Sequence, residues 1–102
     1  MLGEIFQILD LTSKDEQLYM AALKLGPQPA SIIARKADVK RVDAYNHLAC
    51  LCNRGIFRME TRNGIKHFAP CSPDKILRML KIKRSIIVEA ENKLKMLIPV
   101  LS

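Results

Sequence analysis

Two side chains near the middle of this sequence carry groups that match the edges of nucleic-acid bases. Arg41 can donate two parallel hydrogen bonds to guanine or bind a phosphate, and Asn46 can form a bidentate pair with adenine. Val42 and Asp43 follow Arg41, and the Asp43 carboxylate can accept from a cytosine amino group, although it also repels phosphates. On a different surface each of these residues is an ordinary solvated side chain, so the elements that position them decide their chemistry.

Positive charge is concentrated in the same region. Between Arg35 and Arg84 there are thirteen Lys and Arg and four acidic residues, so this stretch has a net charge of +9, whereas the rest of the chain has −2. This distribution suits a surface that faces phosphates, because each neutralised phosphate releases condensed counterions. A solvated basic face is the alternative that charge alone allows. We expect phosphate contacts from six side chains: Arg35, Lys36, Lys40, Arg58, Arg62 and Lys66.

Three helices are expected before Arg41. Apolar residues recur at helical spacing over residues 2–9, which predicts a short amphipathic helix. Ser13 and Glu16 have the spacing of a capping box, so the second helix is expected to begin at Ser13. A third helix is predicted over residues 30–37, with Asp38 in the left-handed turn conformation that glycine usually adopts.

Residues 41–54 are predicted to form the helix that presents the base-matching side chains. Ala44, Leu48 and Leu51 recur at i, i+4 and i+7, which marks the buried face and turns the opposite face outward. With the preceding helix and its short turn, this pattern predicts a helix-turn-helix, whose second helix enters the major groove in proteins that use this motif.

Other side chains of this region receive structural interpretations. Tyr45 is expected to pack in the core with its hydroxyl at the backbone, in preference to binding a phosphate. His47 is interpreted as a partly covered structural side chain and not as a base reader or a pH switch. Cys50 and Cys52 point to different sides of a helix, so they cannot share one metal ion or pair with each other. A redox role for Cys50 or Cys71 is the weaker alternative.

A β-hairpin is predicted after the helix-turn-helix. Apolar and polar residues alternate over residues 57–62, and Asn63-Gly64 is the strongest short hairpin pattern, because both residues accept positive φ angles. Residues 65–69 form the expected return strand. Arg62 and Lys66 flank the turn, where their side chains can reach a neighbouring groove or phosphate.

One long helix is predicted to begin at residues 72–74 and to run to Ile98, where Pro99 stops it. An apolar seam with alternating spacings of four and three is typical of a coiled coil, so we expect this helix to pair two copies of the chain. Lys83 is the only polar residue of the seam, and one polar position sets register at some cost in stability. The seam consists of Ile76, Leu80, Lys83, Ile87, Ala90, Leu94, Leu97 and Leu101.

The expected fold is mainly α with a small β-hairpin: a winged helix-turn-helix over residues 1–72, including the short N-terminal helix, and a dimerisation helix over residues 73–102. The sequence has no glycine-rich phosphate loop, no metal-spaced histidine pair and no nucleophile motif, so we expect no enzymatic activity, no cofactor and no metal. The odd number of cysteines and the lack of a leader or a long apolar run favour a cytoplasmic, nucleoid-associated protein without membrane contact.

Taken together, three segments resemble the DNA-binding domain of the TrmB family of archaeal and bacterial transcription regulators. They are "LTSKDEQLYMAALKLG" (11–26), "ASIIARKADVKRVDAYNHLACLCNRGIF" (30–57) and "FAPCSPDKIL" (68–77). MarR-like and ArsR-like regulators have a similar plan. The resemblance implies that the helix over 41–54 enters the major groove, that the hairpin touches the adjacent backbone and that the C-terminal helix joins two subunits.

The resemblance also shows two departures. Family members usually carry a small polar residue where this chain has Val42, and often a basic or polar residue in place of Asp43, so base reading by these two positions is in doubt. Longer members continue into a sugar-binding effector domain, whereas this sequence ends with the long helix, so no sugar response and no small-molecule effector are expected.

These observations predict a sequence-specific regulator that binds double-stranded DNA as a homodimer. The main alternative is an architectural, chromatin-like protein that coats DNA without sequence preference, which the charge distribution and the apolar Val42 and Ala49 also allow. A third hypothesis is an adaptor whose winged helix binds protein or RNA.

Overall fold

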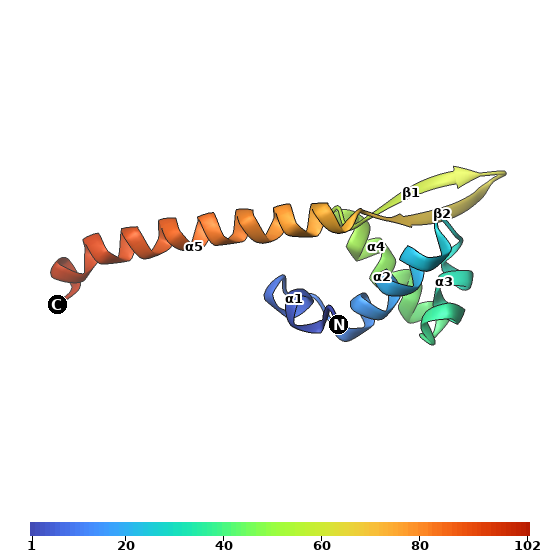
Figure 1. Cartoon of the computed structure of the whole chain (residues 1–102), viewed down its shortest axis with the longest axis horizontal. Helices are drawn as coiled ribbons and strands as arrows, with labels where there is room; N and C mark the ends of the chain where they lie inside the picture. The colour runs from blue at the N-terminus through green and yellow to red at the C-terminus, as the bar shows by residue number, and fades with distance from the viewer. The chain divides into compact units, whose positions relative to one another are not determined.

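The computed structural model describes residues 1–102, which divide into two compact units, Met1–Ser72 and Pro73–Ser102. The first unit contains four helices and a two-stranded antiparallel hairpin, and the second is a single helix (Figure 1). The elements are α1 (Gly3–Ile8), α2 (Ser13–Leu25), α3 (Ala30–Ala37), α4 (Arg41–Asn53), β1 (Phe57–Arg62), β2 (Ile65–Pro70) and α5 (Pro73–Leu101).

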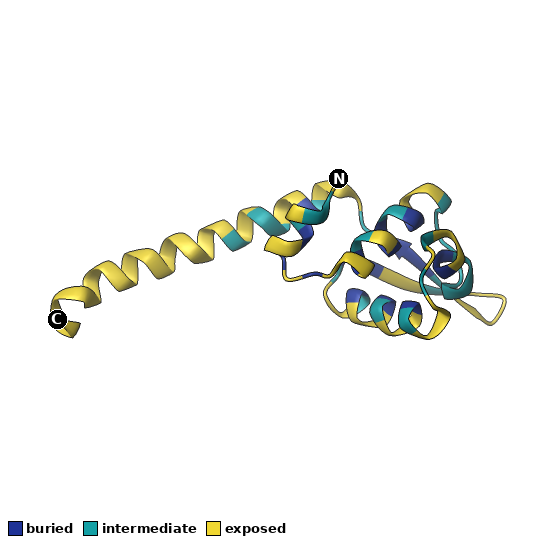
Figure 2. Ribbon diagram, turned by 90° about the horizontal axis from the view of Figure 1, so that it is seen from below, coloured by how far each residue is buried: buried dark blue, intermediate teal, exposed yellow.

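The core of the first unit forms where α2, α3 and α4 pack on one another, and its buried residues line the inner sides of these helices (Figure 2). The expected stripe of α4 is confirmed, because Ala44 and Leu48 are fully buried and Leu51 is 1% exposed. Asp38 has a φ of 57°, so it forms the predicted left-handed turn between α3 and α4. Burial of one face fixes which side of α4 faces outward.

Helix α1 is one residue shorter at each end than the range 2–9, and it packs on the rest of the first unit. Phe6 is buried, and its ring lies 5.5 Å from the ring of Tyr19 between centroids. Arg54 donates from Nη2 to the carbonyl oxygen of Leu9 at 2.6 Å, so the end of α4 holds the end of α1. The amide of Leu2 donates to Glu16 Oε2 at 2.8 Å.

The capping box of α2 lies one residue earlier than expected. Thr12 is the N-cap: its Oγ1 accepts from the Asp15 amide, and the Asp15 carboxylate accepts from the Thr12 amide. The predicted start of the helix at Ser13 is confirmed, but the predicted capping pair of Ser13 and Glu16 was wrong, since both registers have the required spacing and Thr12 is the extended N-cap.

Thr12→Ala is therefore expected to lower the free energy of unfolding by about 1 kcal/mol, because it removes the cap on an otherwise unsatisfied amide. Ser13→Ala is the matched control, since Ser13 lies inside the first turn and should contribute little. Urea unfolding followed by circular dichroism measures both variants. A larger loss for Ser13→Ala would contradict the observed register.

The predicted hairpin is confirmed, and we call β1 and β2 with their turn the wing. Asn63 and Gly64 have φ angles of 52° and 76°, as a tight hairpin turn requires. The return strand extends to Pro70, one residue beyond the expected range. An isolated bridge joins the wing to the α2–α3 loop, because the amides and carbonyls of Gln28 and Phe68 bond to each other at 2.8 and 3.2 Å.

Helix α5 continues through Pro99 to Leu101, so the expected end before Pro99 was wrong. A proline removes one hydrogen bond, and here that bond would lie in the last turn, where the loss is small. The amide of Ser102 still donates to the carbonyl of Ile98 at 3.1 Å. The structure contains no helix with both the length and the hydropathy that crossing a bilayer requires.

Candidate nucleic-acid interface

The outer face of α4 is open to solvent along its whole length. Its exposed residues follow the helical repeat that complements the buried stripe. Val42 is the most exposed apolar side chain of the helix, at 73%. The exposed set is Arg41, Val42, Tyr45, Asn46, Ala49, Cys50 and Asn53.

The N-terminal half of this face forms one wall of a groove of about 620 Å³, which we call the α4–wing groove. The start of α3 and the tip half of the wing form its other sides. It is lined by Pro29, Ala30, Ser31, Arg41, Val42, Tyr45, Asn46, Gly64, Ile65, Lys66 and Phe68. The structure thus brings together five of the side chains singled out from the sequence, namely Arg41, Val42, Tyr45, Asn46 and Lys66.

Tyr45 lies in this groove and not in the core, so the expected core packing was wrong. Its side chain is 44% exposed and its ring lies edge-on to Phe68, at 6.1 Å between centroids. Its hydroxyl accepts a long hydrogen bond of 3.5 Å from Nζ of Lys66. The hydroxyl and the ammonium group therefore form one polar site at the wall of the groove.

The buried tyrosine with a backbone-bonded hydroxyl is Tyr19. It is fully buried and donates from its hydroxyl to the carbonyl oxygen of Cys71 at 2.9 Å. Burial raises the pKa of Tyr19 well above its usual value, because the ionised phenolate would lose its hydration. Each tyrosine directly follows a buried residue of an apolar helical stripe, Leu18 or Ala44, so their different positions depend on the elements that cover them.

Two helices begin beside or within the groove without a side-chain cap. The N-cap of α3 is Pro29 and that of α4 is Lys40, and neither side chain bonds to a first-turn amide. Ala30 and Ser31 line the groove, so the start of α3 contributes N–H donors and the positive end of its dipole there. Together with Arg41 and Lys66, these groups make the groove favourable for an anion.

The other basic residues of the wing lie on its opposite face. Lys66 pairs with Thr61 in the register of the strands, whereas Arg62 pairs with Ile65 and therefore projects to the other side. Arg58 shares the face of Arg62, as expected from strand alternation. Arg62 also donates from Nη2 to Glu60 Oε1 at 2.7 Å, which offsets part of its charge.

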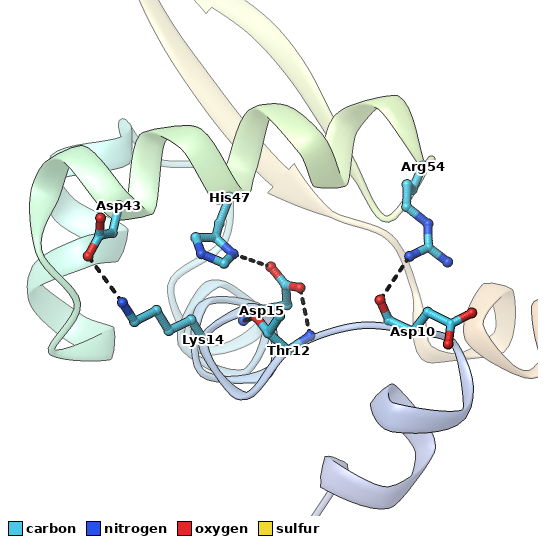
Figure 3. A network of polar contacts seen from close by, with 7 residues as sticks. All are labelled: Asp10, Thr12, Lys14, Asp15, Asp43, His47 and Arg54. Atoms are coloured by element: carbon cyan, nitrogen blue, oxygen red, sulfur yellow. Dashed lines mark hydrogen bonds and ion pairs between the residues drawn. The ribbon is translucent and has the colours of Figure 1, made fainter.

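The remaining candidates also lie outside the groove. Asp43 turns toward α2, where its carboxylate accepts from Nζ of Lys14 at 3.1 Å (Figure 3). Lys36 lines a shallow depression with residues of α2. Arg35 and Lys40 are exposed at the end of α3 and just before α4. Asp43 is therefore separated from its neighbours Arg41 and Val42 by the helical repeat.

His47 links α4 to the start of α2. Its Nδ1 donates to Asp15 Oδ1 at 2.7 Å, and the other oxygen of this carboxylate accepts from the Thr12 amide (Figure 3). The histidine side chain is 28% exposed and the aspartate side chain 9%. The partly covered position predicted for His47 is confirmed, and its polar partner in α2 was not foreseen.

Replacement of His47 by leucine is expected to destabilise the fold by about 1–3 kcal/mol, because one oxygen of the nearly buried Asp15 carboxylate loses its donor. Lys14→Ala breaks the neighbouring exposed ion pair with Asp43 and should cost about 1 kcal/mol or less. Thermal unfolding compares the two variants. DNA affinity of folded His47→Leu should equal that of the wild type, and a selective loss of affinity would make His47 a contact residue.

Sequence reasoning missed several parts of the groove. Ile65 and Phe68 of the wing line it, and so do Ala30 and Ser31 at the start of α3. The position of Ile65 directly after Asn63-Gly64 placed it near the tip of the hairpin, which is the only sequence pattern that pointed to it. The approach of the wing to the start of α3 depends on the bridge between Gln28 and Phe68, for which the sequence has no local pattern.

Comparison with known proteins gives a family and a set of structural relatives. The model of a family described as "sugar-specific transcriptional regulator TrmB" matches residues 6–74, more than half of the chain. No curated protein matches the sequence. Three solved structures are similar to this chain.

The AntR antimony-specific transcriptional repressor is 26% identical, with 88% of this chain and 82% of that chain covered and a TM-score of 0.57. A possible transcriptional regulator from Methanosarcina mazei Go1 is 16% identical, with coverage of 89% and 82% and a TM-score of 0.70. TrmBL2, an archaeal chromatin protein, is 18% identical at a TM-score of 0.70. The match with TrmBL2 covers 98% of this chain but 43% of that protein.

The last two likenesses show the fold alone, and they confirm the predicted winged helix-turn-helix with a long C-terminal helix. The relatives with this fold include one transcriptional repressor and one possible transcriptional regulator. The match over residues 6–74 spans α2 to β2, so it contains every residue of the α4–wing groove. This chain belongs to the TrmB family of transcriptional regulators.

Proposed function

We propose that this protein is a sequence-specific regulator that binds double-stranded DNA as a homodimer. The observation that carries the proposal is the α4–wing groove, where an exposed helix face and a basic strand meet beside an uncapped helix start. Arg41 and Asn46 supply base-matching groups on that face. Lys66 supplies a cation from the wing, and it donates to the hydroxyl of Tyr45 on the same face of α4.

Such a surface fits a duplex in one orientation. Helix α4 would enter the major groove with its N-terminal residues toward the base edges, and the wing would lie over the adjacent backbone. One sugar-phosphate strand then passes through the α4–wing groove, where Lys66 and the first amides of α3 bind its phosphates. The phosphate contacts set the position of α4, and Arg41 and Asn46 read bases.

The basic residues outside the groove would add affinity without sequence preference. Their exposed side chains can approach phosphates on either side of the central contact. We assign this role to Arg35, Lys36, Lys40, Arg58 and Arg62. Asp43 would not read a base. Its ion pair with Lys14 compensates its negative charge and so would reduce its repulsion of the DNA phosphates.

The homodimer part of the proposal rests on the second unit. Ile87, Leu94 and Leu97 are each 50% exposed or more, and they recur at spacings of seven and three on one side of α5. A long helix with such an apolar seam exposed is unfavourable in water and gains stability when the seams of two copies pack together. Two α4 helices could then occupy successive major grooves about 34 Å apart.

Selection of bound fragments from a random duplex pool, at physiological salt, tests the proposal. We expect enrichment of a site with two similar half-sites, bound at least about 1,000-fold more tightly than unrelated duplex. Fluorescence anisotropy of the enriched and a scrambled duplex, each at several salt concentrations, measures the ratio. Equal affinity for both duplexes would refute sequence specificity.

An architectural DNA-coating protein is the second candidate. It is favoured by one observation, the apolar character of Val42 and Ala49 on the exposed face of α4, where polar base readers would be expected. It predicts similar affinity for all duplexes and the same steep dependence on salt. The selection experiment above separates the two candidates, because only a sequence-specific protein enriches one site.

A further inference from the structure

We infer that Val42 is a specificity-determining residue, and that its methyl groups contact the C5-methyl of a thymine in the major groove. The inference rests on the proposed function and adds to it the identity of one base. It also gives a role to the side chain that departs from the small polar residue expected at this position.

The position of Val42 has no explanation within the fold. The core of α4 is made by Ala44, Leu48 and Leu51, which leave Val42 on the opposite face at 73% exposure. A single exposed apolar residue is common on protein surfaces. Here, however, Val42 lines the α4–wing groove beside the ring of Tyr45, which is 44% exposed.

The groove therefore combines apolar surface with positive charge. Val42 and the ring of Tyr45 provide the apolar part, and Arg41 and Lys66 provide two cations, with no acidic side chain in the lining. The uncapped start of α3 adds backbone donors that suit an anion. The matching ligand carries negative charge beside an apolar group.

A thymidine nucleotide within a duplex has both features. Its phosphate can bind Lys66 and the start of α3, while its base presents a methyl group at the edge of the major groove. Thymine is the only one of the four bases with such a methyl group, so an aliphatic contact at this point selects A·T pairs in one orientation. Arg41 and Asn46 lie on the same face of α4, so their bases would be near neighbours of this thymine.

The test replaces single thymines of the selected duplex by uracil, which removes only the C5-methyl group. With the wild-type protein, one position in each half-site should show a loss of affinity of about fourfold per half-site, the effect of burying one methyl group. Val42→Ala should lose a similar factor on the thymine duplex and should show no further loss on the uracil duplex. Fluorescence anisotropy with both proteins and both duplexes completes a double-mutant cycle.

Two further variants make the result specific. Val42→Thr retains one methyl group and the branched shape, so it should show an intermediate uracil effect. Leu23→Ala removes a 40% exposed apolar side chain of α2 that does not line the groove, and it should keep the full uracil effect. Because Val42 is so exposed, Val42→Ala should melt at no lower temperature than the wild type, as circular dichroism can verify.

The outcomes separate the inference from the proposed function. If a preferred site exists but no thymine is sensitive to uracil, or if Val42→Ala keeps the wild-type uracil effect, the inference is wrong and the proposed function stands. If no preferred site is enriched, sequence specificity and the inference both fail. The inference is supported if the uracil effect disappears with Val42→Ala and persists with Leu23→Ala.

Discussion

Replacing Ile87 and Leu94 together by aspartate is expected to convert the protein to a monomer and to lower its affinity for a two-half-site duplex by at least about 100-fold. Both residues belong to the exposed seam of α5, at 50% and 53% exposure. In a paired helix they would be covered by the partner's seam, and a carboxylate placed there would lose its hydration without gaining a partner. Without the dimer, the second α4 no longer binds at the high effective concentration that the first binding event provides.

Val88→Asp is the matched control, because Val88 is 48% exposed and lies outside the seam. It introduces one carboxylate into the turn of α5 that contains Ile87 and should remain dimeric. Light scattering after size-exclusion chromatography measures the assembly state, and anisotropy on duplexes with one and two half-sites measures the coupling. A double variant that stays dimeric would remove α5 as the dimerisation element, and an unchanged two-site affinity of a true monomer would show that the half-sites act independently.

Arg41→Ala is expected to weaken binding to the selected duplex by about 1–3 kcal/mol, which corresponds to about 5- to 150-fold. Its guanidinium lies at the start of α4 in the α4–wing groove. Glu60 binds Arg62 and the carbonyl of Leu9 binds Arg54, so those two arginines are already engaged within the chain. Loss on an unrelated duplex should be smaller, because a base contact contributes only where the correct base is present.

Two variants define what the Arg41 result means. Lys66→Ala should weaken both duplexes equally and reduce the slope of log affinity against log salt by about one, as expected for a phosphate contact. Arg58→Ala removes an arginine from the opposite face of the wing and should cause a small, equal loss. If Arg41→Ala also weakens both duplexes equally, Arg41 binds a phosphate, and base reading must be assigned to other residues of α4.

Local sequence patterns were sufficient for most of the secondary structure. Periodic apolar residues identified α3 and α4, and Asn63-Gly64 identified the turn of the wing, because helix faces and tight turns depend on residues a few positions apart. The resemblance of three sequence segments to the TrmB family identified the family, which the match over residues 6–74 confirms. Pro99 was the exception, since the last turn of a helix tolerates a lost hydrogen bond that its interior does not.

Where two local patterns competed, tertiary packing decided between them. Thr12 and Ser13 both begin a valid capping box, and burial of Leu11 beside α1 selected Thr12. Tyr19 and Tyr45 both belong to helices with apolar stripes, and the covering of Tyr19 by Phe6 and Phe57 made it the core residue. The contacts that cover Tyr19 come from residues more than one helical turn away in the sequence.

The sequence alone determined which residues could read bases or bind phosphates, because those abilities belong to the side chains themselves. Only the tertiary structure decided which of them share a surface. The register of β1 and β2 turned Lys66 toward Tyr45 and Arg62 away from it, and the bridge between Gln28 and Phe68 joins the wing to the loop before α3. The start of α3 and the wing line the same groove although they lie more than thirty positions apart in the sequence. Long-range contacts, and not local preference, therefore assemble it.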